Sequence, residues 1–179
     1  MPKTQFISRA IALGILSFVM TTLAAQIVQA AKRPVPLLHN TCVTIPSGSL
    51  YRRTDTISIG REIYKSLFYL YPVNGSASVT CKIVPDNSLP MFQTLRLGFG
   101  MSDSDSSSPS IAVNVYLNGQ RTVSKIVSPG QATSLSLNVS NVTDVSIESV
   151  CSSQGQQSCG QLYFFNALLE PKTPLGQKK

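Results

Sequence analysis

The chain has 179 residues, and 15 Lys and Arg side chains against 8 Asp and Glu give a formal net charge of +7 at pH 7. This length accommodates one domain that buries most of its surface. The basic balance favours contact with anionic surfaces, but the charge is spread too thinly to indicate nucleic-acid binding. The one local concentration, at Arg52, Arg53, Arg61 and Lys65, is typical of a solvated strand face.

The N-terminus has the pattern of a secretory signal peptide. Two basic residues precede an apolar stretch at 10–25, and small residues stand before the junction of Ala30 and Ala31. The apolar stretch is shorter than the roughly 20 residues that a membrane span needs. We therefore expect cleavage after Ala30, a secreted or periplasmic protein, and no stable membrane anchor after cleavage. The alternative is an uncleaved anchor.

Cleavage there would leave residues 31–179, with a formal charge of +5 because two of the 15 basic residues lie in the signal peptide (13 − 8 = 5). Residues 31–40 contain basic residues and prolines, which predicts a mobile tether. The folded domain is expected over 41–170. A flexible tail is expected over 171–179.

The chain contains four cysteines, an even number in a chain bound for an oxidising compartment, which indicates disulfides. Three pairings are possible. Cys151 and Cys159 flank a polar, glycine-containing loop, so we favour that pair, which leaves Cys42 with Cys81. A zinc site would need closely spaced cysteines and histidines, whereas His39 is the only histidine.

Alternation of apolar and polar residues recurs along the chain and predicts β-strands. In the stretch 111–117, "IAVNVYL", four apolar residues alternate with Ala112, Asn114 and Tyr116, and the following Asn118-Gly119 predicts a tight hairpin. About ten short antiparallel strands are expected, which indicates an all-β sandwich or barrel. The expected strands are 41–45, 56–59, 63–71, 77–83, 94–101, 111–117, 121–127, 133–139, 143–149 and 161–169.

Residues with catalytic chemistry are few. Nucleophilic catalysis needs a nucleophile, a base and an orienting group, and no such set or G-x-S-x-G motif is found, so an enzyme is not expected. The sequons at Asn74, Asn138 and Asn141 would be glycosylated only in a host with that machinery; chance occurrence is the alternative.

The polar stretch "MSDSDSSSPS" at 101–110 places Asp103 and Asp105 two positions apart between two predicted strands. Together with the serine hydroxyls they are candidate calcium ligands. Calcium normally takes 6–8 oxygens from several segments, so the alternative is a plain polar loop. No other cofactor is expected.

Four successive segments resemble the NPCBM family of carbohydrate-binding modules. Gly60 and Tyr64 match the family's first segment, and the stretch "LGFGMSDSD" supplies its glycine and paired aspartates. The hairpin "VNVYLNG" matches the third segment and "FNALL" near residue 166 the last. The chain departs from the family in lacking tryptophan, with Phe164 where that residue is usual and Tyr163 where an aspartate closes the motif.

The resemblance implies a galactose-binding-like β-sandwich (jelly roll) and a non-catalytic module that binds a cell-wall or extracellular polysaccharide. Tyr69 and Tyr71 alternate onto the same side as Lys65, which predicts exposed rings that could lie against a sugar; core packing is the alternative. The candidate ligand-binding residues are Asp103, Asp105, Tyr69, Tyr71 and Arg61. The alternative function is a protein-binding envelope or adhesion module of the same fold.

Overall fold

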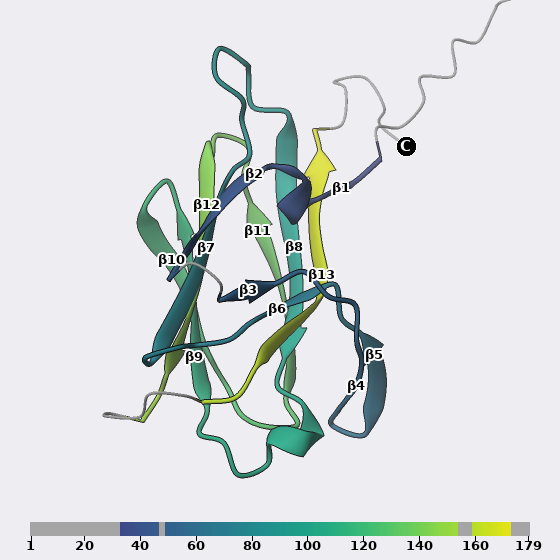
Figure 1. The fold of residues 1–179 in the computed structure, drawn as a ribbon. Helices are drawn as coiled ribbons and strands as arrows, with labels where there is room; N and C mark the ends of the chain where they lie inside the picture. Colours follow the sequence, from purple (N-terminus) through teal and green to yellow (C-terminus); the bar gives the residue numbers. More distant parts are fainter. Residues whose placement is uncertain (1–32, 47–48, 154–158, 173–179) are drawn as a thin grey trace, which may run out of the picture. The chain divides into compact units, whose positions relative to one another are not determined.

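Antiparallel strands form nearly all the regular structure of the described residues. The computed structural model describes residues 33–46, 49–153 and 159–172, all within one compact unit, Ala31–Lys179. The predicted signal peptide and its cleavage junction lie outside the described residues, as does the predicted tail beyond residue 172. The thirteen strands of the described residues form two large sheets and one small hairpin sheet (Figure 1).

The larger sheet has six strands and carries both chain ends of the described domain. In spatial order its strands are β11 (Ala132–Asn138), β8 (Phe92–Gly100), β13 (Leu162–Pro171), β6 (Phe68–Leu70) and β3 (Leu50–Tyr51), and β1 (Val35–Pro36) also pairs with β13. The register of β13 on β8 shifts between Phe164 and Asn166, so Phe165 has no partner there and forms a bulge.

The second large sheet has five strands, and only β9 and β10 are neighbours both in space and in the chain. In spatial order the strands are β10 (Gln120–Val127), β9 (Ile111–Leu117), β12 (Asp144–Cys151), β7 (Ser76–Lys82) and β2 (Thr41–Ile45). The β9–β10 hairpin turns at Asn118 and Gly119, with φ of 50° and 78°, as the Asn-Gly pair predicted.

Three small elements complete the described domain. Strands β4 (Thr56–Ile59) and β5 (Glu62–Lys65) pair as a hairpin outside the two large sheets. The 3₁₀ turn η1 (Leu37–His39) follows β1, and η2 (Asp103–Asp105) lies between β8 and β9. No helix among the described residues is long and apolar enough to cross a membrane.

The alternating apolar residues of both large sheets meet in one core. The apolar residues predicted to face inward are buried, with Ile111, Val113 and Val115 of β9 and Val145 and Ile147 of β12 all fully covered. The predicted all-β sandwich is therefore confirmed. The polar residues between them point away from the core, and they give the five-stranded sheet a polar outer face.

Two predicted segments differ from the structure. The expected single strand 63–71 divides at Ser66, which is fully buried; its backbone N–H donates to the Asp55 carbonyl at 2.8 Å, and its hydroxyl accepts from the Asp55 N–H. This divides the segment between β5 and β6. Residues 35–40 are expected in the tether, but Val35 and Pro36 pair with β13 and the following turn η1 buries Leu37, because an apolar Val-Pro-Leu-Leu stretch gains more from packing than from solvent.

Both predicted disulfides are present. Cys42 of β2 is bonded to Cys81, its register partner on β7, and Cys151 at the end of β12 is bonded to Cys159. The first bridge ties the edge strand β2 to the five-stranded sheet. The second spans the connection that leaves that sheet for β13 of the other.

Candidate functional site

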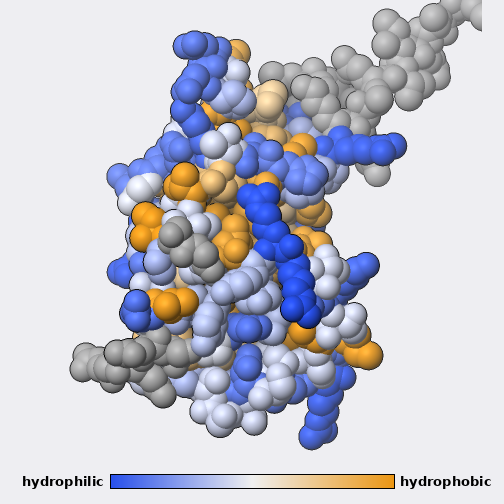
Figure 2. Space-filling view, viewed as in Figure 1, coloured by the Kyte–Doolittle hydropathy of each residue, from blue (hydrophilic) through white to orange (hydrophobic). Residues whose placement is uncertain are grey.

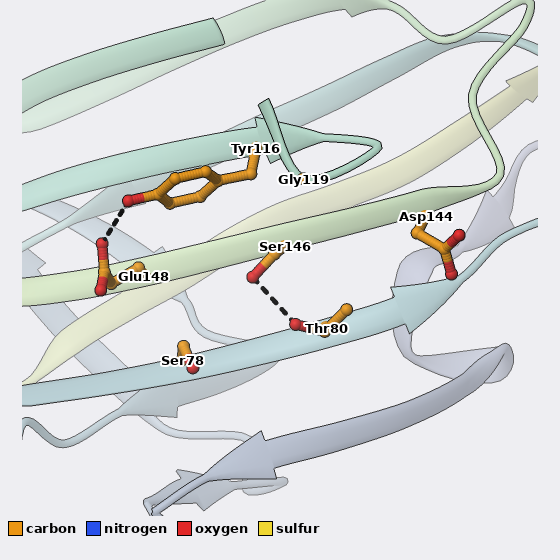
Figure 3. Close-up of a pocket in the computed structure, with 7 residues that line it drawn as sticks. All are labelled: Ser78, Thr80, Tyr116, Gly119, Asp144, Ser146 and Glu148. Atoms are coloured by element: carbon orange, nitrogen blue, oxygen red, sulfur yellow. Dashed lines mark hydrogen bonds between the residues drawn. The ribbon is translucent and has the colours of Figure 1, made fainter. Parts of the chain in front are cut away.

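A polar groove of about 330 Å³ lies on the outer face of the five-stranded sheet. It is lined by Ser78, Thr80, Tyr116, Gly119, Asp144, Ser146 and Glu148 (Figure 3). Apart from Gly119 in the hairpin turn, these residues come from β7, β9 and β12, the three central strands, at positions that alternate with core residues. The side-chain alternation that fills the core therefore also builds the groove.

The strand register sets two rows of side chains across the groove. Thr80, Ser146 and Tyr116 are successive register partners on β7, β12 and β9. The next row runs from Ser78 through Glu148. The floor is hollow because hydroxyl residues with short side chains occupy β7 and β12, while the larger Tyr116 ring stands beside them.

Hydrogen bonds fix the polar side chains of the groove. Tyr116 donates its hydroxyl to Glu148 Oε2 at 2.8 Å, and the Asn114 amide donates to the same oxygen at 3.0 Å. Thr80 donates to the Ser146 hydroxyl at 2.9 Å (Figure 3). Asn114 is almost fully buried, so it holds the Glu148 carboxylate from beneath the surface. These bonds hold the Tyr116 ring and the Glu148 carboxylate in fixed positions before a ligand binds.

The hairpin turn fixes one end of the groove. The Asn118 Oδ1 atom accepts from the Thr143 N–H at 2.9 Å and from the Asp144 N–H at 3.2 Å. These bonds hold the start of β12 against the turn that contains Gly119. Gly119 has no atom within 4 Å of the position a Cβ would take, so this end stays open to solvent.

The groove is acceptor-rich. Among the described residues its lining includes two carboxylates, Asp144 and Glu148, and no Lys, Arg or His side chain. The hydrogen bond to Glu148 is the main cause that raises the pKa of Tyr116, followed by burial and the Glu148 charge, while the Arg121 charge opposes them. Tyr116 therefore stays a neutral donor at physiological pH. A ligand that brings hydroxyl donors and an apolar ring face matches this lining.

The structure places Asp103 in a structural role. Its carboxylate accepts from the Ser58 hydroxyl at 2.5 Å, the Gly60 N–H at 2.8 Å and the Arg61 N–H at 3.1 Å. These bonds, led by the Ser58 hydroxyl, lower the pKa of Asp103. Gly60 and Arg61 both have positive φ in the β4–β5 turn, so Asp103 ties this turn to η2. Arg61 contributes its backbone here and its side chain is exposed.

Asp105 lies in a different environment from Asp103. Its Oδ2 atom is buried with no hydrogen-bond partner among the described residues. Burial raises the pKa of Asp105, and a hydrogen bond from the Gln161 backbone opposes the shift. No group of three or more His, Cys, Asp or Glu side chains in the described part of the chain is placed to hold a metal ion. Calcium binding by this loop stays a prediction.

Tyr69 lies on β6 of the six-stranded sheet and Tyr71 directly follows that strand, and neither lines the groove. Tyr69 is register partner to Tyr51 and Tyr163, with ring centroids 4.7 Å and 5.4 Å away. These rings leave Tyr69 only 8% exposed, so its predicted exposure is wrong. Tyr71 is half-buried and donates its backbone N–H to the Ser49 carbonyl at 2.9 Å. None of the five predicted ligand-binding residues lines the groove.

Sequence reasoning missed Tyr116, Glu148 and the hydroxyl floor. The available signal was that each of three predicted strands carries polar residues on one face. Their adjacency was hidden, because β7, β12 and β9 pair across 25 residues or more of sequence, as the partners Ser146 and Tyr116 illustrate.

Solved structures of similar fold include several carbohydrate-binding modules. A family 51 module from a Clostridium perfringens family 95 glycoside hydrolase, solved with methyl-galactose, superposes with a TM-score of 0.60 at 11% identity, over 76% of this chain and 99% of that one. A second family 51 module of the C. perfringens protein ZmpB, solved with GlcNAc, gives 0.58 at 11% identity over 78% of this chain and 32% of that longer chain.

Tandem family 51 modules of a Streptococcus pneumoniae family 98 glycoside hydrolase give a TM-score of 0.52 at 12% identity, over 84% of this chain and 46% of that one. At such low identity the likeness shows the fold, a galactose-binding-like β-sandwich. No protein-family model matches the sequence, and no curated protein matches it. The NPCBM resemblance therefore stays a prediction at the level of the family.

Proposed function

We propose that this protein is a secreted or periplasmic, non-catalytic carbohydrate-binding module that holds a neutral glycan in the groove of the five-stranded sheet. The observation that carries the proposal is a hydroxyl floor bordered by one tyrosine ring and two carboxylates, with no cationic side chain among the described residues of the lining. Its volume of about 330 Å³ is at the small end for ligand pockets, so binding is expected to be weak.

The groove matches the two kinds of surface on a sugar. The apolar C–H face of a pyranose can lie against the Tyr116 ring, while its hydroxyls reach Ser78, Ser146 and Glu148. Glu148 Oε2 already accepts from Tyr116 and Asn114, so the carboxylate is held in place before a ligand arrives. Hydrogen bonds to a charged acceptor contribute about 1.5–3 kcal/mol each, which favours hydroxyl donors.

The charge of the lining favours neutral over acidic glycans. The domain as a whole is basic, and from net charge alone acidic polysaccharides are equally reasonable ligands. Within the groove, however, Asp144 and Glu148 would repel a uronate or sulfate group at close range, where the interaction is least screened by salt. The carboxylates of the lining therefore favour neutral glycans, against the opposing charges of Lys82 and Arg121, the register partners of Asp144 and Tyr116.

Hydrogen bonds hold both carboxylates of the groove in place. Glu148 accepts from Tyr116 and Asn114, and Asp144 accepts from the Thr143 hydroxyl at 2.7 Å. These bonds position both groups to accept further hydrogen bonds from a ligand. A glycan-binding role also agrees with the fold neighbours, whose solved ligands are methyl-galactose and GlcNAc, both neutral sugars.

A glycan array and affinity electrophoresis in neutral and acidic polysaccharides test the proposal on wild type and variants. Tyr116→Ala is expected to weaken binding of the best neutral glycan at least tenfold, because the ring face is lost. Glu148→Gln is expected to weaken it less and to reduce the discrimination against acidic glycans. The matched control is Tyr51→Ala, which removes an exposed tyrosine from the other sheet.

Circular dichroism confirms that each variant remains folded. Binding that survives Tyr116→Ala and is lost in Tyr51→Ala would move the site to the six-stranded sheet. Absence of binding to every glycan, together with retention of a specific protein partner from envelope extract, would favour the protein-binding alternative.

A further inference from the structure

A second cavity, of about 340 Å³, lies beside the six-stranded sheet and differs from the groove in chemistry. Its apolar walls come from η1, the start of β6 and the middle of β13. The main contributors are Leu37, Leu38, Leu67, Phe68 and Leu168. Leu67 of the cavity wall is 44% exposed, and Tyr51, which directly precedes the lining residue Arg52, is 41% exposed. Figure 2 shows hydrophobic side chains among hydrophilic ones on the face that carries β3.

The polar side chains at this cavity are basic. Arg52 and His39 line it, and no carboxylate of the described residues does. Arg52 Nη1 donates to the Leu38 carbonyl at 3.1 Å, so the guanidinium is held across the cavity by a neutral acceptor. A guanidinium has five N–H donors, and one such bond leaves the others for a further acceptor.

Arg52 differs from its neighbours in having no carboxylate partner within the described part of the chain. The ion pairs of the described residues are Arg53 with Asp55, Lys82 with Asp86 and Arg96 with Glu170. The charge of the neighbouring Arg53 is compensated by Asp55, with Nε 2.8 Å from Oδ1, whereas Arg52 takes part in none of these ion pairs. A positioned, uncompensated guanidinium beside an apolar cavity is complementary to a carboxylate next to an apolar group.

We propose that this cavity is a docking site for a partner protein segment that presents an apolar side chain beside a carboxylate. Leu67 at the cavity and the neighbouring Tyr51 are both exposed, and a polypeptide partner can cover these side chains together with the cavity. The chain's own ends, residues 31–32 and 173–179, carry lysines and so bring like charge to Arg52. A second copy docked through the same cavity would likewise oppose Arg52 to Arg52.

The docking site and the groove share no lining residue, and they belong to different sheets. One ligand therefore does not exclude the other. The domain can link a glycan to a protein, so the two functions expected as alternatives from the sequence become two sites of one molecule.

The test is selection of a random twelve-residue peptide library, displayed with free C-termini, on the immobilised full chain. Wild type is expected to enrich peptides that combine an apolar residue with an adjacent Asp, Glu or terminal carboxylate. Arg52→Glu is expected to weaken the best enriched peptide at least tenfold, and Arg52→Lys less. Lys125→Glu, on an exposed strand of the other sheet, is the matched charge control and is expected to leave binding unchanged.

Melting temperatures show whether each variant is folded, and Leu168→Gln gives an independent probe of the apolar wall. The proposal is overturned if no peptide is enriched, or if enriched peptides lack carboxylates or bind Arg52→Glu as well as wild type. Decanoate that binds more tightly than any enriched peptide would assign the cavity to small amphipathic acids instead. Self-association in sedimentation that Arg52→Glu abolishes would assign it to a second copy.

Discussion

Asp103 and Asp105 stand two positions apart in one 3₁₀ turn, yet the fold gives their carboxylates opposite environments. Asp103 accepts three hydrogen bonds, which lower its pKa. Asp105 has one oxygen buried with no described partner, and burial raises its pKa. The sequence suggests that the two aspartates bind one ligand together, whereas in the structure the charge of Asp103 stabilises the fold and the charge of Asp105 destabilises it.

We expect Asp103→Asn and Asp105→Asn to shift stability in opposite directions. A lowered pKa means that Asp103 stabilises the fold above its ordinary value near 3.8, and that this contribution is lost as pH falls through the lowered value. A raised pKa means that ionised Asp105 destabilises the fold increasingly as pH rises through the interval above 3.8. At pH 7 the melting temperature should fall for Asp103→Asn and rise for Asp105→Asn.

The measurement is thermal unfolding by circular dichroism from pH 2.5 to 7. The difference between Asp105→Asn and wild type should shrink toward the acid end, because the raised pKa makes Asp105 neutral there, whereas the Asp103→Asn difference should persist to lower pH because the pKa of Asp103 is lowered. The calcium hypothesis makes a different prediction: both variants would lose a calcium-dependent rise in melting temperature. The opposite roles of the two carboxylates would be contradicted if both substitutions lowered the melting temperature equally at pH 7 in calcium, and if a chelator abolished this difference from wild type.

At the scale of elements, β8 supplies a flat strip onto which the β4–β5 hairpin packs. A Cβ at Gly98 would lie 2.5 Å from Phe165 Cε2, and one at Gly100 would lie 2.6 Å from the Gln131 carbonyl oxygen. Phe165 is the bulge residue of β13, and its ring lies 4.4 Å from the Tyr64 ring of β5. The glycines of "LGFG" therefore allow a third layer of side chains on the sheet.

We expect Gly98→Ala and Gly100→Ala each to destabilise the domain by about 1–3 kcal/mol, as overpacking does. The two variants should differ in whether a second substitution restores their stability. Phe165→Ala removes the side chain that obstructs position 98, so the cost of Gly98→Ala should largely disappear in that background. Ile59→Ala should not rescue Gly100→Ala, because the nearest obstruction there is the Gln131 backbone.

Urea unfolding of the single and double variants gives both coupling energies. Gly119→Ala serves as a comparison, since no atom lies near that Cβ and the cost there comes from the positive φ alone. If Gly100→Ala were as stable as wild type, or if Ile59→Ala restored its stability, the surface of β8 at Gly100 would not be close-packed against the Gln131 backbone.

At the scale of the whole molecule, the two disulfides reinforce the sandwich at different places. Cys42–Cys81 has a sequence separation of 39 and Cys151–Cys159 one of 8, so the chain-entropy model assigns them about 4 and about 2.5 kcal/mol. The larger contribution retains β2 on the sheet that carries the groove. Such bonds persist in oxidising compartments, which agrees with the proposed export.

We expect protein recovered from its native host to lie outside the cytoplasm and to begin at Ala31. Small residues before the junction and a short apolar stretch are the features that signal peptidase reads. N-terminal sequencing combined with peptide mapping under non-reducing conditions checks the cleavage site and both bridges together. Intact Met1 in a membrane fraction would show an uncleaved anchor instead.

Local features of the sequence determined a large part of the fold. Alternation assigned the inward faces of most strands, because side chains on a strand point to opposite sides in turn. Asn118-Gly119 determined the β9–β10 hairpin, since both residues accept positive φ. The polar loop between Cys151 and Cys159 indicated one disulfide, and the other followed by elimination.

Only the tertiary structure decided which polar faces meet. The groove requires β7, β12 and β9 to be neighbours, and pairing between distant segments is set by the packing of the whole core rather than by any local preference. The order of strands also places Tyr51 and Tyr163 against Tyr69, whose ring they cover. It places Arg52 beside an apolar cavity that has no carboxylate among its described lining residues. Alternation determines the face of a strand to which a side chain points, and the order of strands in the sheet determines its neighbours there.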